Sequence, residues 1–90
     1  MGRFGQRYFY YQAGSGTDTI FDYQSGDMLK ILKSNGAAGG KYKKSSFSNG
    51  TLALTILGGG SVIFENVTAS TNFNINGTSY KISGSKLVKK

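Results

Sequence analysis

The chain contains no cysteine, histidine, proline or tryptophan. The absence of cysteine excludes a disulfide framework, a thiolate zinc site and a cysteine nucleophile. The absence of histidine excludes the Ser-His-Asp and Cys-His catalytic arrangements and every His-ligated metal site. A metal ion bound by this chain therefore needs oxygen ligands, which favours calcium or magnesium.

Long apolar runs and helical periodicity are missing as well. No stretch approaches the ~20 apolar residues of a membrane-spanning helix, so no membrane span is expected. The first residues lack the apolar segment of a signal peptide, and no long window repeats its apolar positions with the helical period. With 90 residues, the chain is expected to form one small domain over residues 1–90.

Alternation with a period of two is the dominant pattern. In residues 51–56 it places Leu52, Leu54 and Ile56 on one face, as in a half-buried strand. Many short strands at close spacing predict an all-β fold, mainly antiparallel, arranged as a roll or a small sandwich. The strands expected from this pattern span residues 8–11, 19–23, 28–32, 42–47, 51–57, 61–65, 72–75, 78–82 and 86–90.

Glycine-containing turns separate these strands. Asn49-Gly50 and Asn76-Gly77 each lie between two alternating segments. This dipeptide favours a hairpin with a type I′ turn, because that turn needs two residues at positive φ. Residues 34–40, which are rich in glycine and alanine, are expected to form a flexible loop.

The charge of the chain is strongly basic and unevenly distributed. Eleven lysines and arginines against four acidic residues give a net charge of +7. Three of the four acids lie in residues 18–27, and residues 30–90 carry nine lysines against one glutamate, a balance of +8. An excess of this size favours an anionic partner such as nucleic acid or an acidic polysaccharide.

One segment carries a motif that offers oxygen ligands for a metal ion. Residues 13–21, AGSGTDTIF, fit the nonapeptide G-G-x-G-x-D-x-U-x, with alanine in place of the first glycine. In this pattern the glycine-rich half turns tightly and exposes backbone carbonyls, the aspartate supplies a carboxylate, and the following apolar residue points into a core. Stacked copies share calcium ions between neighbouring turns, so one copy supplies half of a site.

The resemblance extends beyond the nonapeptide. Residues 9–31, FYYQAGSGTDTIFDYQSGDMLKI, resemble the last repeat of RTX (haemolysin-type calcium-binding repeat) proteins, which has the shape F-x-Y-x-x-G-x-G-x-D-T-I-x-D-Y-x-x-G-D-x-L-x-I. Residues 46–64 and 73–82 look like the strand pair and the closing hairpin that follow that repeat. The resemblance covers residues 7–90 and implies a β-roll cap.

The resemblance assigns residues 8–33 to a degenerate repeat and residues 41–90 to a β-hairpin cap. It implies a non-enzymatic capping module of a secreted or bacterial cell-surface protein. The implied partners are the adjoining repeats of a parent chain. Because a cap without its repeats leaves a strand edge unpaired near residues 8–11 and 19–23, a homo-oligomer through that edge is also expected.

Calcium is the cofactor that the resemblance implies. Asp18 is the first candidate ligand, with the carbonyls of Gly14 and Gly16. Asp22 and Asp27 approach the same ion if the chain reverses between them. Because a single degenerate copy offers few ligands, the expected binding is weak.

Binding of a polyanion, either nucleic acid or an acidic polysaccharide, is the alternative function. Its candidate residues are basic positions close to aromatic ones, as in single-strand binding surfaces: Arg3, Arg7, Lys41, Lys43 and Lys44. No RNP or cold-shock pattern supports nucleic acid. Catalysis is not expected, because three of the four acids lie in one glycine-rich region and offer no independent general acid.

Overall fold

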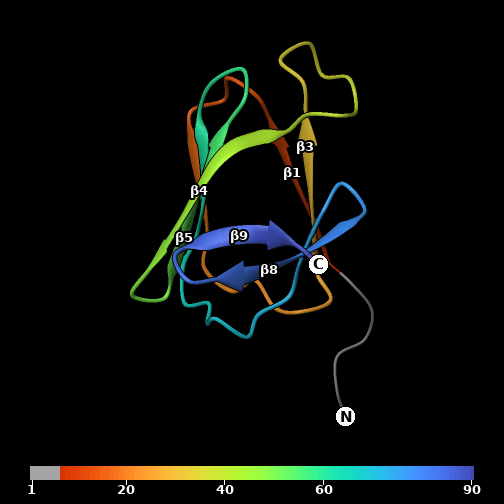
Figure 1. The fold of residues 1–90 in the computed structure, drawn as a ribbon. Helices are drawn as coiled ribbons and strands as arrows, with labels where there is room; N and C mark the ends of the chain where they lie inside the picture. Colours follow the sequence, from red (N-terminus) through yellow and green to blue (C-terminus); the bar gives the residue numbers. More distant parts are fainter. Residues whose placement is uncertain (1–6) are drawn as a thin grey trace.

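The computed structural model describes residues 7–90, which form nine strands in two sheets and contain no helix. The first sheet has the strand order β1-β3-β7-β8-β9 and the second has the order β2-β6-β5-β4 (Figure 1). These residues therefore include no helix that is long and apolar enough to cross a membrane. The strands are β1 (Tyr8–Gln12), β2 (Thr17–Ile20), β3 (Met28–Leu32), β4 (Tyr42–Ser48), β5 (Thr51–Ile56), β6 (Ser61–Phe64), β7 (Phe73–Ile75), β8 (Thr78–Ser83) and β9 (Lys86–Lys89).

The first three strands form one turn of a parallel coil. β1 lies in the first sheet and β2 in the second, and β3 returns to the first sheet, where it pairs in parallel with β1. Phe9 lies opposite Leu29 in this pairing. β2 in turn pairs in parallel with β6, with Ile20 opposite Phe64. The coil therefore supplies the edge strand at the same end of each sheet, β1 in the first and β2 in the second.

The remaining strands are joined mostly by hairpins. Four of the seven strand pairings are antiparallel, namely β4–β5, β5–β6, β7–β8 and β8–β9. The two Asn-Gly turns have φ values of 52° and 77° at Asn49 and Gly50, and of 54° and 86° at Asn76 and Gly77. The expected positive φ at both positions of each turn is confirmed, and so is the all-β class.

A single apolar core lies between the two sheets. Leu52, Leu54 and Ile56, which the alternation places on one face, are completely buried. Val62 and Phe64 of the neighbouring strand β6 are buried beside them. The other buried apolar residues come from both sheets and from the loops: Tyr11, Ala13, Tyr23, Leu29, Ile31, Val67, Phe73, Ile75, Ile82 and Leu87.

Most of the expected strands agree with the structure to within one residue at an end, and β2 differs most. The strand expected over residues 19–23 begins and ends earlier, as β2, because Tyr23 turns into the core and the Asp22 carbonyl accepts a hydrogen bond from Arg7. The loop over residues 34–40 makes backbone hydrogen bonds, including one from the Gly40 amide to the Ile31 carbonyl at 2.9 Å, and its flexibility stays a prediction.

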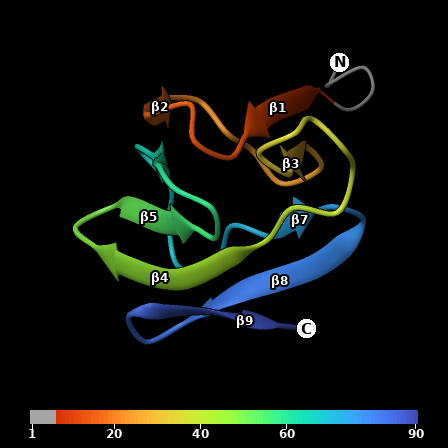
Figure 2. The same ribbon diagram turned by 90° about the horizontal axis from the view of Figure 1, so that it is seen from above.

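The two ends of the sandwich are different. At one end β4 lies against β9, and the Phe47 amide donates to the Ser85 carbonyl at 2.8 Å while the Leu87 amide donates to the Ser45 hydroxyl at 2.9 Å. At the other end lie β1 and β2 (Figure 2), and no described strand pairs with their outer edges. We call this second end the open end.

Candidate functional site

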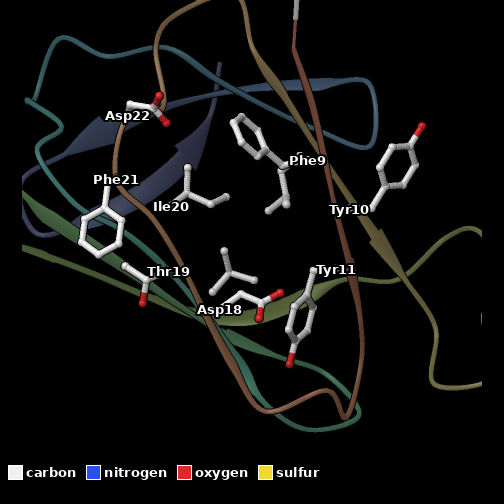
Figure 3. Close-up of a pocket in the computed structure, with 10 residues that line it drawn as sticks. Phe9, Tyr10, Tyr11, Asp18, Thr19, Ile20, Phe21 and Asp22 are labelled. Atoms are coloured by element: carbon white, nitrogen blue, oxygen red, sulfur yellow. The ribbon is translucent and has the colours of Figure 1, made fainter.

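A hollow of about 570 Å³ lies at the open end between β1 and β2. Its floor is made by the buried side chains of Leu29 and Val62. Phe9, Asp18 and Ile20 point into it from the two edge strands (Figure 3). We call this space the terminal hollow. The terminal hollow lies where the core ends. β3 and β6 continue the two sheets on one side of it, and no described strand follows on the other.

Two exposed aromatic residues lie at the rim of the terminal hollow. Tyr10 of β1 and Phe21, which follows β2, are each 63% exposed (Figure 3). Exposed aromatic side chains beside an open strand edge are characteristic of a surface that pairs with another chain or segment. The open end is therefore a candidate docking surface.

The alternation of β2 places Asp18 on its inner face. Asp18 lies opposite the buried Val62 of β6 and precedes Ile20 by two residues, so both side chains point inward. Asp18 remains exposed only because the terminal hollow is open. The nonapeptide pattern, in which the apolar residue after the aspartate faces the core, is followed here.

The glycine-rich turn of the motif rests on a second glycine turn. The Tyr11 hydroxyl donates to the Gly16 carbonyl at 2.5 Å, and the Ser61 amide donates to the same carbonyl at 3.0 Å. The Gly14 amide donates to the Gly59 carbonyl at 3.0 Å. A carbonyl oxygen has two lone pairs, so the Gly16 carbonyl, a candidate calcium ligand, has both engaged. Sequence reasoning missed Tyr11 and the Gly58–Gly60 turn as parts of this site.

Asp27 is held by Arg7 rather than turned towards the motif. Its side chain is completely buried. Its carboxylate accepts hydrogen bonds from the Arg7 guanidinium at 2.6 and 3.2 Å, from the Arg7 amide at 3.2 Å and from the Gln24 amide at 3.1 Å. Arg7 also donates to the Asp22 carboxylate at 2.8 Å. We call these contacts the Arg7 clasp.

The ionisation of Asp27 follows from the Arg7 clasp. Burial by itself raises the pKa of this carboxyl, but the hydrogen bonds from the Arg7 side chain and from the Gln24 and Arg7 amides outweigh burial, so that its pKa lies below the usual value. The same hydrogen bonds, those from Arg7 to Asp27 first and to Asp22 second, raise the pKa of Arg7. Both groups are therefore charged at neutral pH.

Tyr23 anchors the loop between β2 and β3, which also carries Asp22 and Asp27. Its hydroxyl donates to the Asp27 carbonyl at 2.5 Å and accepts from the Asn74 amide at 3.0 Å. Its ring stacks on Phe73 with 5.0 Å between the ring centroids and meets Phe64 edge-on. Burial raises the pKa of Tyr23 to about 12. These contacts anchor the loop from β2 to β3 to the core through the buried Tyr23.

The candidate calcium ligands do not converge on one point. Asp18 and Asp22 both line the terminal hollow, but the carboxylate of Asp22 is paired with Arg7, and so is that of Asp27. Over residues 7–90, no three acidic side chains gather in a way that could hold a metal ion. Calcium binding stays a prediction.

The candidate polyanion-binding residues are also separated. Arg3 lies outside the described residues, and Arg7 belongs to the clasp. Lys43 and Lys44 are exposed at the irregular start of the β4–β5 pairing. Lys41 lines a second groove, described below.

No family model, curated protein or solved structure matches this chain. The described residues form a two-sheet β sandwich with one parallel coil at its open end.

Proposed function

We propose that this domain is a non-enzymatic cap that closes one end of a parallel β-roll in a secreted or cell-surface repeat protein. One observation carries the proposal. β1 and β2 are consecutive strands joined by a tight turn, and they form the outer edges of both sheets at the same end. If a coil of the same shape preceded this one, one of its strands could pair with β1 and the other with β2.

The edges and the terminal hollow suit such a coil. The backbone of an edge strand offers unpaired N–H and C=O groups that a further strand can bind. β1 and β2 already pair in parallel with their inner neighbours, so a parallel coil would continue both sheets. An inward-pointing apolar side chain of that coil would fill the space between Phe9 and Ile20.

The opposite end supports the same proposal. Contacts between β4 and β9 close it, so coils can be added in one direction only. Repeat proteins need terminal units of this kind, because an exposed end of a repeat array leaves apolar surface uncovered.

A fusion protein tests the capping function. A designed array of tandem nonapeptide repeats is joined before the full chain, and its calcium-driven folding is followed by circular dichroism. We expect the fused array to fold at a lower calcium concentration than the array alone. Ile20→Lys should raise the calcium midpoint of the fusion by about tenfold, because stacking would bury the new charge.

Thr17→Lys is the matched control for this experiment. It adds the same charge to the same strand at an exposed position that does not line the terminal hollow, and should leave the midpoint of the fusion nearly unchanged. An array that folds at the same calcium concentration with and without the domain would refute the capping function. Equal effects of the two lysine variants would refute the role of the terminal hollow.

The isolated domain is proposed to bind calcium only weakly, through Asp18. The dissociation constant for calcium should be on the order of 10⁻⁴–10⁻³ M, as in extracellular modules, or larger, because one copy of the motif lacks the neighbouring turn that would complete the oxygen shell. Calorimetric titration should show that Asp18→Asn abolishes the binding heat and that Asp22→Asn, with its carboxylate already on Arg7, changes it little. A calcium response that survives Asp18→Asn would place the ion elsewhere.

The same open edges support self-association of the isolated domain. Two copies that meet at their open ends would pair the edges that a parent repeat otherwise covers. The homo-oligomer expected from the sequence is therefore retained as part of this proposal.

A further inference from the structure

A second groove, of about 560 Å³, lies between the start of β4 and the β7–β8 hairpin. Tyr42, Thr78 and Tyr80 line it together with the lysines Lys41 and Lys89. We call it the lysine groove. It is separate from the terminal hollow, with which it shares no lining residue.

The charge of the lysine groove is uncompensated. Lys41 comes from the segment before β4 and Lys89 from the end of β9, and no acidic residue lines the groove. In the described part of the chain, neither lysine forms an ion pair. The one acidic residue between positions 30 and 90, Glu65, accepts a hydrogen bond from the Thr51 hydroxyl. Two ammonium groups that share a groove without a carboxylate favour an anion between them.

Hydroxyl groups lie beside these charges. The Tyr42 and Tyr80 rings meet edge-to-face with 5.7 Å between their centroids, and Tyr80 lies opposite Lys89 in the β8–β9 pairing, so their side chains share one face. Burial raises the pKa of Tyr42, which keeps its hydroxyl a donor at neutral pH. Thr78 adds a third hydroxyl that can donate and accept.

The wall of the lysine groove is fixed by Asn76. Its amide nitrogen donates to the Gly40 carbonyl at 2.6 Å, and its amide oxygen accepts from the Ile31 amide at 2.9 Å. This side chain therefore ties the β7–β8 turn to the segment that carries Lys41. A groove held in this way is formed before a ligand arrives, which reduces the ordering cost of binding.

We propose that the lysine groove binds the carboxylate-bearing sugar units of an acidic polysaccharide, a function in addition to capping. A uronate sugar carries on one ring the carboxylate that Lys41 and Lys89 attract and the hydroxyls that Tyr42, Thr78 and Tyr80 can pair with. Nucleic acid is disfavoured, because base stacking needs an exposed ring face beside the positive charge. The strongly exposed aromatics Tyr10 and Phe21 lie by the terminal hollow instead.

Titration of the full chain with oligogalacturonate tests this proposal. Lys41→Gln/Lys89→Gln should weaken binding at least tenfold, as measured by calorimetry at physiological salt. Lys81→Gln/Lys86→Gln is the matched control, because it removes the same charge from two exposed lysines that do not line the groove. The control should weaken binding less than threefold. Tyr80→Phe, which keeps the ring and removes the hydroxyl, should weaken it severalfold.

Three outcomes would overturn the proposal. Equal losses for the two double variants would mean that only the overall charge attracts the polymer. Absence of oligogalacturonate binding would exclude the ligand class, and tighter binding of single-stranded oligothymidine would point to nucleic acid. Neutral dextran should not bind. Circular dichroism of each variant checks that the fold is kept, and these results do not depend on whether the fused repeat array folds.

Discussion

Alanine at Gly60 is expected to prevent stable folding of the domain. A Cβ atom at this position would lie 2.5 Å from the Gly16 carbonyl oxygen and would overlap the Tyr11 hydroxyl. Gly60 also has a φ of +85°. Since the Gly16 carbonyl belongs to the turn that carries the nonapeptide and accepts a hydrogen bond from the Tyr11 hydroxyl, relief of the clash would separate β2 from β6. We expect a loss of at least about 4 kcal/mol in the free energy of unfolding.

Gly77→Ala separates the clash from the backbone strain. Gly77 has nearly the same φ, +86°, but a Cβ there would meet no atom within 4 Å. Its substitution should cost about 1–2 kcal/mol, the price of a left-handed conformation for alanine. Urea denaturation of both variants measures the difference. Equal losses would show that the Gly58–Gly60 turn does not support the motif.

Asp27→Asn should be the most damaging substitution among the acidic residues. Asp27 is completely buried, and its carboxylate accepts four hydrogen bonds from Arg7 and Gln24. Asparagine has the same shape, but it loses the charge and directs an amide group at some of these donors. We expect a loss of about 3 kcal/mol in urea denaturation. Asp22→Asn is the control and should cost much less, because 67% of the Asp22 side chain is exposed.

The pH dependence of stability should change in the same variant. Since the pKa of Asp27 is lower in the folded chain than in the unfolded chain, its ionised form contributes stability that is fully present above about pH 4. This contribution is lost as the pH falls through the folded-state pKa. Denaturation between pH 2 and pH 6 should therefore show a smaller acid loss for Asp27→Asn than for the natural chain. Parallel profiles would contradict the role of the Arg7 clasp.

Local patterns predicted the strands and their faces well. The alternation around Leu52, Leu54 and Ile56 depends only on neighbouring residues, and the same holds for the positive φ of Asn49-Gly50. The inward direction of Ile20 also follows from its place in the nonapeptide. These features could be predicted because each is set within a few residues of chain.

Contacts between distant segments could not be predicted in this way. Asp22 and Asp27 were expected to approach an ion shared with Asp18, but both meet the Arg7 guanidinium, 15 and 20 positions away in the chain. Lys41 was expected to act with its neighbours Lys43 and Lys44. It shares its groove instead with Lys89, which the β8–β9 hairpin brings there.

The sequence by itself determined the all-β class, the nine strands, the Asn-Gly turns and the excess of positive charge, because each depends on composition or on local alternation. Only the tertiary structure decided that the first coil pairs in parallel with β6 and β7 and that no described strand pairs with its outer edges. It also decided that Gly60 packs against the Tyr11 hydroxyl. The physical reason is that strand pairing and burial are set by the packing of segments far apart in the chain, which no local pattern encodes.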